Sequence, residues 1–385
     1  MPEIRELNEG DEAAWMRNMA QAYRRGDRGD GTQHWPVDES IRRFGLFEGG
    51  DLVAQFALRS YAMFFGEKRV PMGGIAAVAC LPLARGKGHV ESLLWHGLER
   101  MRAAGQPLSA LHAFLVGLYR PMGWEWVGSQ RRYTLPLAHL PRDLEPRGVR
   151  AARPADVGTL QALYESDAAR YRGMLVRDSS WWRERLESRT GHAHYFYLYE
   201  RARPEGYLYL QMQEPARVRE LIATTPEAYR ALLGVLRRHR AQLKSVTWTA
   251  PPDDPLWHIA AHWEIEVAWR PPFSGRVVDL PAAVALLSPD PSLAGECVLE
   301  VEDSLTPWNT GVWRITAEGG VARAERTTQA AEASCDVGAF SQMLFGDPDA
   351  VALRRAGRLP VTHEGAFAFL RALCPPALCW MNDYF

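Results

Sequence analysis

A glycine-rich basic turn lies between an apolar run and an amphipathic run, in the stretch from residue 73 to residue 105. The turn consists of Arg85, Gly86, Lys87 and Gly88. Apolar residues then recur at helical spacing as far as Met101, and Gly105 is a natural stop. A turn of this kind leaves backbone N–H groups free at the positive end of the helix dipole, and its glycines let a ligand approach the backbone. The sequence therefore predicts an anion site, best suited to a phosphate or pyrophosphate.

The turn matches neither of the two common phosphate loops. It lacks the final Lys-Ser or Lys-Thr of a P-loop and the third glycine of the dinucleotide fingerprint. It resembles the acetyl-CoA loop of the GNAT N-acetyltransferase superfamily, Arg/Gln-x-x-Gly-x-Gly/Ala, with Arg85 first and Gly88 fourth. Val90 at the sixth position departs from the usual small residue. The alternative is an ordinary strand-turn-helix with a solvated basic turn.

A tyrosine about thirty residues after the turn supplies the second part of the pattern. Tyr119 stands before Gly123 and Trp124 as Tyr-x-x-x-Gly-aromatic. In the GNAT superfamily a tyrosine at about this distance places its hydroxyl beside the sulfur of CoA, and the resemblance implies the same here. When an amine attacks a thioester, a positioned acid helps the thiolate to leave, and a phenol with a pKa near ~10 can be that acid. For Tyr119 alone, the alternative is a half-buried aromatic residue at a helix end.

Length and composition indicate a globular protein of two or three domains. The chain has 385 residues, too many for one compact core, with 47% hydrophobic and 24% charged residues. Its net charge of −1 argues against a nucleic-acid or anionic-membrane partner. No apolar run approaches the ~20 residues that span a bilayer, and the charged N-terminus has no signal-peptide core. The 5 scattered cysteines suggest reduced thiols, so we expect a cytoplasmic location.

The first unit is predicted over residues 1–141. Its expected elements are a helix over Asp11–Tyr23, a hairpin turning at Gly49-Gly50-Asp51, a second strand pair bent at Gly66, the apolar strand and helix around the basic turn, a short strand over Ala110–Val116 and a last strand over Trp124–Leu135. The proline-rich stretch Leu140–Gly148 is predicted to be a linker.

The second unit, residues 146–275, is predicted to be a degenerate copy of the first. Arg-x-Ala-Arg-Pro-x-Asp, from Arg150 to Asp156, resembles the opening of many acetyltransferase-like domains. No Arg-x-x-Gly-x-Gly turn follows, and the helix after Thr225 has an ordinary N-cap in its place. We therefore expect this copy to be structural and not to bind CoA.

The third unit, residues 280–385, is predicted to combine a helix, strands and a further short helix. Residues 298–303 alternate like a strand. The pattern Asp-x-x-x-Pro-x-Asn-x-Gly-x-Trp, from Asp303 to Trp313, resembles the sterol-carrier-protein fold.

The loop, the tyrosine, the second copy and the sterol-carrier-like unit occur together in one family. The whole chain resembles the Eis (enhanced intracellular survival) family of GNAT acetyltransferases, with further family-like stretches at Val70–Ile75, Gly173–Asp178 and Arg276–Asp279. The resemblance implies transfer from acetyl-CoA to a small amine, aminoglycoside-like and polycationic, by direct attack. It also implies a homo-oligomer, in this family often a hexamer.

The resemblance implies roles for individual residues. Tyr119 would be the acid, and the C-terminal carboxylate of Phe385 would accept the proton of the attacking amine. The alternative for the C-terminus is a frayed tail, although this one is apolar and aromatic. Amides of Val78, Ala79 and Cys80 would bind the pantetheine arm. The pyrophosphate would lie on Arg85, Gly86, Lys87, Gly88, His89, Val90 and Glu91. Backbone contacts to CoA would come from Phe114 and Leu115.

Three other groups could do chemistry. His258 and His262 lie four apart, but Glu264 is off that helix face, so no metal site is expected. Cys374 and Cys379 are better explained as buried thiols than as a redox pair. Acids at Asp27, Asp30, Glu125 and Asp383 could form a wall that attracts a polyamine, or could simply be solvated.

The predicted fold class is α+β, with tandem GNAT acetyltransferase folds followed by a sterol-carrier-like domain. The predicted function is acetyl-CoA-dependent N-acetylation of a primary amine, without a metal. One alternative is a transferase for another acyl group or for peptide amines. The other is a non-catalytic lipid- or CoA-binding protein with a vestigial loop.

Overall fold

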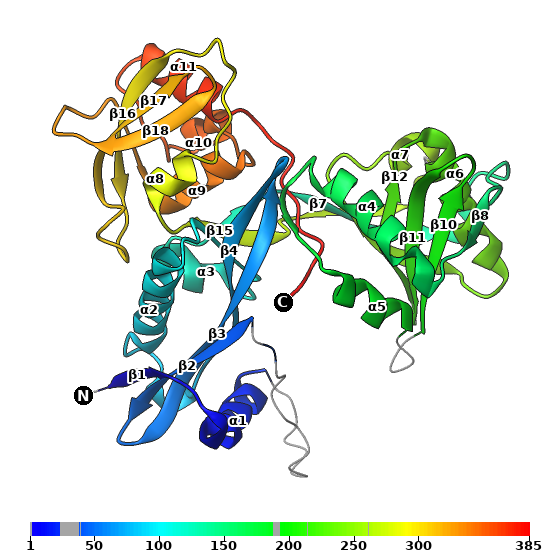
Figure 1. The fold of residues 1–385 in the computed structure, drawn as a ribbon, viewed down its shortest axis with the longest axis horizontal. Coiled ribbons are helices and arrows are strands. Elements are labelled where there is room, and N and C mark those ends of the chain that lie inside the picture. The colour runs from blue at the N-terminus through cyan, green and yellow to red at the C-terminus, as the bar shows by residue number, and fades with distance from the viewer. Residues whose placement is uncertain (1, 24–37, 39, 188–192, 214, 261) are drawn as a thin grey trace.

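The structure, a computed structural model, describes residues 2–23, 38, 40–187, 193–213, 215–260 and 262–385. Within them lie three sheets, of eight, seven and four strands. Figure 1 shows the first sheet at the lower left, the second at the right and the third at the upper left. The predicted loop with Asp27 and Asp30 lies outside the described residues.

The first sheet carries the basic turn. Its strands, in spatial order, are β1 (Glu3–Glu6), β2 (Ile41–Glu48), β3 (Asp51–Phe65), β4 (Lys68–Cys80), β5 (Leu108–Leu111), β15 (Phe273–Val277) and β6 (Glu125–Val127), and β9 (Arg172–Leu175) pairs with β3. Its helices are α1 (Glu12–Ala22), α2 (His89–Ala103) and α3 (Val116–Tyr119). The hairpin predicted at Gly49-Gly50-Asp51 is confirmed, because Glu48 pairs with Asp51.

The second sheet belongs mainly to the central part of the chain. Its strands, in spatial order, are β14 (Glu266–Arg270), β7 (Gln130–Pro136), β13 (Ser245–Ala250), β12 (Ala216–Ala223), β11 (Pro204–Met212), β10 (Ala193–Glu200) and β8 (Val149–Ala151). The helices that go with it are α4 (Val157–Ala168), α5 (Ser179–Glu187), α6 (Pro226–Arg238) and α7 (Leu256–Ile259). Alternate residues of β7, β12 and β13 form one core with α6.

The first two sheets exchange strands. The single strand predicted over Trp124–Leu135 is wrong, because β6 stays in the first sheet while β7 pairs with β13 and β14 in the second. In return β15, from the end of the second unit, lies between β5 and β6. Strand patterns in a sequence do not specify partners, so this exchange was not foreseen. The domain limits 1–141, 146–275 and 280–385 stay predictions.

The third sheet forms a separate lobe that shares a core with the first. Its elements are α8 (Leu280–Val284), β16 (Gly295–Glu302), β17 (Gly311–Glu318), β18 (Val321–Arg326), β19 (Ala333–Asp336), α9 (Val337–Phe345), α10 (Ala350–Arg355) and α11 (Glu364–Leu373). Phe340 and Phe345 of α9 pack in one cluster with Met72 and Leu108 of the first sheet. Burial of this apolar surface holds the third lobe against the first.

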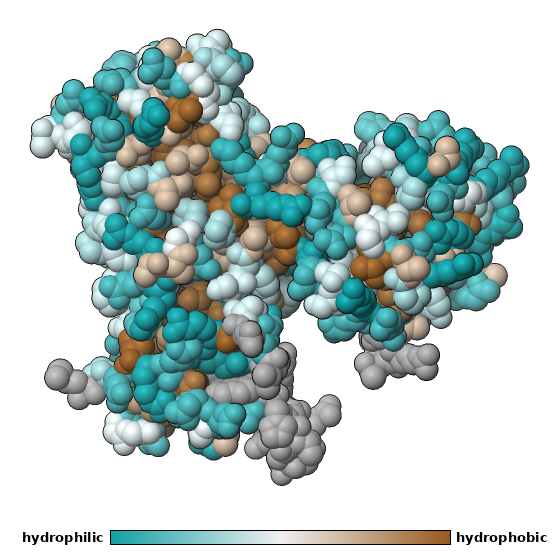
Figure 2. Space-filling view, viewed as in Figure 1, coloured by the Kyte–Doolittle hydropathy of each residue, from teal (hydrophilic) through white to brown (hydrophobic). Residues whose placement is uncertain are grey.

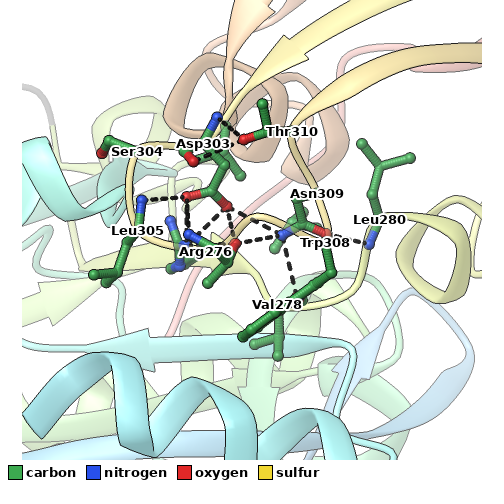
Figure 3. A network of polar contacts seen from close by, with 12 residues as sticks. Arg276, Val278, Leu280, Asp303, Ser304, Leu305, Trp308, Asn309 and Thr310 are labelled. Carbon is green, nitrogen blue, oxygen red and sulfur yellow. Dashed lines mark hydrogen bonds and ion pairs between the residues drawn. The ribbon is translucent and has the colours of Figure 1, made fainter. Parts of the chain in front are cut away.

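A buried ion pair joins β15 to the third lobe (Figure 3). Nη2 of Arg276 donates to both oxygens of Asp303, at 2.9 Å each, and both side chains are 0% exposed. Asp303 also accepts hydrogen bonds from Thr306 and from Nδ2 of Asn309, while Asn309 bonds the backbone at Val278. The Asp-to-Trp pattern of the sequence is therefore the lobe's attachment to the first sheet.

The C-terminal residues leave α11 and run back between the other two lobes, as the red segment of Figure 1 shows. The amide of Arg172 donates to the Leu378 carbonyl at 2.8 Å, and the amide of Trp380 donates to the Arg172 carbonyl at 3.1 Å. Trp380 is buried, 2% exposed, in the core around α4. The tail is thus paired and packed, so the frayed-tail alternative is wrong as far as Trp380. Figure 2 shows mostly hydrophilic residues on this face, with an open cleft between the lower left and right lobes.

Candidate active site

The basic turn has the geometry of an uncapped helix start. Gly86 and Gly88 have φ of +77° and +78°, a region that favours glycine. Gly88 is the N-cap of α2 and offers no side-chain cap, so the first amides of the helix remain available. The side chains of Arg85 and Lys87 are exposed. The turn can therefore hold an anion, as the sequence predicts.

His89, one of the residues predicted to hold the pyrophosphate, does not turn its side chain towards a ligand. His89 is 6% exposed, and its Nε2 lies 3.1 Å from Oε1 of Glu48. Its imidazole therefore faces the protein, which leaves only the backbone of His89 for a ligand. Lys87 also contacts Glu48, at 3.2 Å, and Arg85 Nε donates to the Cys80 carbonyl at 3.2 Å. These contacts tie the turn to β2 and to the end of β4.

The end of β4 separates from its neighbour. β4 pairs with β5 only from Met72 to Ile75. Ala77 has φ of +52°, and the register with β3 shifts there by one residue, which is a β-bulge. Beyond the bulge, Val78 to Cys80 have no strand partner on the β5 side among the described strands. Backbone groups on that side can bind a ligand in extended conformation, as predicted for the pantetheine arm.

Tyr119 lies at the end of α3, facing inward. It is 4% exposed, and its ring makes an edge contact with Phe114 at 6.5 Å between centroids. Burial, and then the neighbouring Tyr23 and Tyr384, raise the pKa of Tyr119 above its ordinary value. The phenol is therefore neutral at pH 7 and can donate its proton. Phe114 and Leu115 are 75% and 58% exposed, so these predicted contact residues are accessible.

The last residue of the chain lies against the first sheet. The ring centroid of Phe385 is 5.0 Å from that of Tyr61 and 5.1 Å from that of His112. The ring of Tyr384 stacks on His112, with 4.4 Å between the centroids. Gly74 makes room for Phe385, because a Cβ there would lie 2.7 Å from the ring. The tail therefore meets β4 near the point where β4 separates from β5.

A buried ionic cluster holds the tail two residues before its end. Arg177 is 3% exposed and donates to Asp383 at 3.0 Å and to Glu220 at 3.0 and 2.5 Å. Asn382 donates to Glu220 at 2.7 Å, and so does Tyr207 at 2.6 Å. Removal of one member would leave a buried charge unpaired. The second lobe thus holds the last residues of the chain in place beside the candidate site of the first lobe.

His112 makes a further contact with the C-terminal residues, and the sequence did not predict it. Its Nε2 lies 3.1 Å from the Asp383 carbonyl. Burial lowers the pKa of His112 to about 4, although the carbonyls of Asp383 and Pro272 oppose the shift. A single histidine after a short strand carries no signal in a sequence, and only the return of the tail makes it notable.

We expect acid to destabilise the protein through His112. The unfolded chain takes up this proton near pH 6.5 but the folded chain only near pH 4, so stability present above pH 6.5 is lost as the pH falls towards 4. Between pH 7.5 and pH 5 the wild type should lose about 2 kcal/mol more free energy of unfolding than His112→Gln. Urea unfolding at both pH values measures this. Equal losses in the two proteins would contradict it.

A cavity of about 660 Å³ lies beside the tail. Its walls come from His112 and Phe114, from Asp383 and Tyr384, and from the second sheet. The volume is that of a small-molecule site. Phe114, one of the lining residues, makes the edge contact with Tyr119, which does not itself line the cavity.

The predicted acidic wall is not present among the described residues. Glu125 is 1% exposed, is bonded to Arg120 and Arg358, and does not line the cavity. Asp383 lines the cavity but is paired with Arg177. Since Glu125 directly follows the Tyr-x-x-x-Gly-Trp pattern, its closeness in sequence to the site was misleading.

The other candidate groups are also placed by the fold. Glu264 was expected to lie off the face of His262, but α7 ends at Ile259 and the two side chains instead meet His139, with ligand atoms within 4.8 Å of one another. That prediction is wrong, because these residues are not helical.

Cys374 and Cys379 are buried and not bonded to each other. Burial raises the pKa of both thiols, which fits the expectation of inert cysteines.

The corresponding helix of the second lobe starts differently. The Thr225 hydroxyl accepts from the amide of Ala228 at 3.2 Å, so the predicted N-cap of α6 is confirmed. A side chain there occupies the position that is free at α2. That this lobe does not bind CoA stays a prediction. No described helix has the length and apolar character needed to cross a membrane.

Comparison with known families assigns all three parts. Residues 3–127 and 173–277 each match an acetyltransferase (GNAT) domain, and residues 280–382 match a sterol carrier protein domain. The predicted α+β fold of tandem GNAT domains and a sterol-carrier domain is confirmed. The chain is a GNAT N-acetyltransferase.

Comparison of the whole chain with individual proteins finds N-acetyltransferases. An uncharacterised N-acetyltransferase of Streptomyces avermitilis is 24% identical over 97% of this chain and 98% of its own length. The N-acetyltransferase Eis of Mycobacterium tuberculosis is 28% identical over 76% of this chain and 75% of its own. The crystal structure of an Eis protein from Mycobacterium abscessus shares the fold, with a TM-score of 0.80, 24% identity and full coverage of both chains. This chain is therefore similar to the Eis N-acetyltransferases in sequence and in fold.

Proposed function

We propose that this enzyme transfers the acetyl group of acetyl-CoA to a primary amine, with Tyr119 as the acid and the carboxylate of Phe385 as the base. One observation carries the proposal. Tyr119 shares one core cluster with Val78 and Cys80 of the opened β4 end and with Val90 at the free start of α2, and the ring of Phe385 packs against the same sheet.

The residues would act in one direct step. Amides at the end of β4 orient the thioester, and the α2 turn holds the pyrophosphate. The amine loses a proton to the Phe385 carboxylate, directly or through water, and attacks the acetyl carbonyl. As the C–S bond breaks, the Tyr119 hydroxyl protonates the leaving thiolate. The products are the N-acetylated amine and CoA.

Thiol release from acetyl-CoA, measured with a panel of amines, tests the proposal. We expect turnover to fall by tenfold or more in a variant lacking Tyr384 and Phe385, with acetyl-CoA binding retained, because a positioned base is lost. An extension of Gly-Ser after Phe385 is the sharper variant, since it keeps both aromatic rings and moves only the carboxylate. Equal turnover in wild type and extended protein would remove the carboxylate from the mechanism. Co-purified lipid without any acetyl-CoA binding would favour the lipid-binding alternative.

The turn before α2 gives a second expectation. Gly88→Ala places a methyl group at φ of +78° where phosphate should lie, so the KM for acetyl-CoA should rise about fivefold or more at nearly unchanged kcat. Gly105→Ala is the matched control, because it imposes φ of +68° at the other end of α2. Similar KM values for acetyl-CoA in the two variants would show that the change comes from backbone strain and not from a lost phosphate contact.

The remaining features implied by the family stay predictions. These are a cytoplasmic location, a homo-oligomer such as a hexamer, and a polycationic, aminoglycoside-like acceptor. Sedimentation velocity would decide the oligomeric state. The charges around the cavity bear on the acceptor.

A further inference from the structure

Four arginines gather on one face of the second sheet, where it borders the cavity. They are Arg132 of β7, Arg217 and Arg219 of β12, and Arg270 of β14. Strand alternation places them there, because their neighbours Tyr133 and Val218 point into the core on the opposite face. The β7 and β12 residues flank β13, whose Thr249 and Thr247 pair with Arg132 and Arg217.

The positive charge of this cluster is not compensated by the described residues around it. None of the four guanidinium groups has an ion-pair or hydrogen-bond partner in the described parts of the chain. The pKa of Arg217 is lowered, first by burial and then by the charges of Arg219 and Arg132. The carboxylate on the cavity wall, Asp383, is already bound to Arg177. Like charges held together without a counter-ion are destabilising, unless an anion binds between them.

The cavity lies beside the reaction centre proposed above. Of its lining residues, His112 contacts Phe385 and Phe114 contacts Tyr119, although Phe385 and Tyr119 do not themselves line it. A small molecule in this space can therefore present one end to the tail and the other to the arginines. Guanidinium groups suit that second role, since their paired N–H donors match the oxygens of carboxylates and phosphates.

We propose that this cavity binds the acceptor by an anionic group, a carboxylate or a phosphate, so that the substrate is an amine with a negative charge at its far end. The proposal rests on the acetyl transfer proposed above and names its substrate class. A polycation is disfavoured, because four guanidinium groups on the cavity wall would repel it and Asp383, the acid that lines the cavity, is bound to Arg177.

Four amines that share a two-carbon stem test the proposal. O-phosphoethanolamine and β-alanine carry an anion, ethanolamine is neutral at that end, and ethylenediamine is cationic. We expect kcat/KM in the thiol-release assay to be at least tenfold higher for an anionic amine than for the other two. The ratio of O-phosphoethanolamine to β-alanine then tells phosphate from carboxylate. Equal or better use of ethanolamine or ethylenediamine would overturn the proposal.

The variant Arg132→Gln/Arg217→Gln ties the preference to these residues. It should raise the KM for the preferred anionic amine by tenfold or more and leave the KM for acetyl-CoA unchanged. Arg240→Gln, an exposed arginine after α6, is the matched control and should change nothing. Equal KM values for the anionic amine in the double variant and the wild type would overturn the proposal.

Calorimetric titration of O-phosphoethanolamine or β-alanine into the CoA-saturated protein separates this proposal from the proposed function. Binding that is weakened by the double variant, with no thiol release from any amine, would remove the acetyl transfer and keep the anion site. Thiol release without any arginine-dependent binding would keep the transfer and remove the anion site.

Discussion

Replacement of Tyr119 by phenylalanine is expected to lower the turnover of acetyl transfer by ~10²–10⁴-fold while acetyl-CoA affinity stays nearly unchanged. The substitution removes only the hydroxyl. The ring keeps its place at the end of α3 and its edge contact with Phe114. What is lost is the proton that the leaving thiolate needs at the moment the C–S bond breaks.

The environment of Tyr119 explains the size of this effect. The side chain is buried and the pKa of its phenol is raised, so the hydroxyl is fully protonated at working pH. No hydrogen bond from this hydroxyl to another described residue holds the proton back.

A matched substitution separates chemistry from packing. Tyr199 is also buried, at 1% exposed, and its hydroxyl has no partner among the described residues, but it lies in the core of the second lobe. Tyr199→Phe should therefore leave kcat unchanged. Steady-state kinetics and acetyl-CoA binding for both variants provide the comparison. Near-normal turnover of Tyr119→Phe would remove the tyrosine from the mechanism.

The second large effect concerns stability. Asp303→Ala should lower the free energy of unfolding by about 3–5 kcal/mol, because it leaves the Arg276 guanidinium buried without a counter-ion. Both side chains are 0% exposed, and Asp303 also accepts from the amides of Leu305 and Thr306 (Figure 3). Arg276 lies on β15, between β5 and β6, so the loss should weaken the first sheet as well as its attachment to the third lobe.

Two comparisons make this prediction specific. Glu296→Ala removes an exposed carboxylate of β16 and should change stability by less than about 0.5 kcal/mol. Arg276→Met/Asp303→Leu replaces both charges and should recover part of the loss, because neither charge then needs a partner, although the buried donors of Leu305, Thr306 and Asn309 still lose their acceptor. Urea unfolding measures all three variants. A loss for Asp303→Ala no larger than that for Glu296→Ala would contradict the role of the ion pair.

Local patterns were sufficient for the parts of the site that are local. The basic turn, its glycines at positive φ and the following helix α2 are contiguous in sequence, and hydrophobic period and turn chemistry predicted them. Tyr119 could be predicted in the same way, because its position relative to Gly123 and Trp124 is a short-range pattern. The N-cap at Thr225 also depends only on neighbouring residues.

Pairing between distant segments was not predictable from those patterns. A strand's alternation tells which residues share a face but not which strand lies beside it. The exchange of β7 and β15, the closeness of His139 to His262, and the contact of His112 with the tail all depend on such pairing. Glu125 failed as a surface acid for the same reason, since its partner Arg358 lies in the third lobe.

The sequence by itself predicted the class of enzyme, the fold of each part and the residues proposed to bind acetyl-CoA, because short-range patterns carry the resemblance to known acetyltransferases. Only the tertiary structure decided the charge of the cavity. Arg132, Arg217, Arg219 and Arg270 are scattered over about 140 residues and resemble ordinary surface arginines in a chain of net charge −1. Strand register brings them to one face of one sheet, and the tail, held by Arg177, closes the cavity beside them. Charge that acts on a ligand depends on proximity in space, and composition carries no information about that.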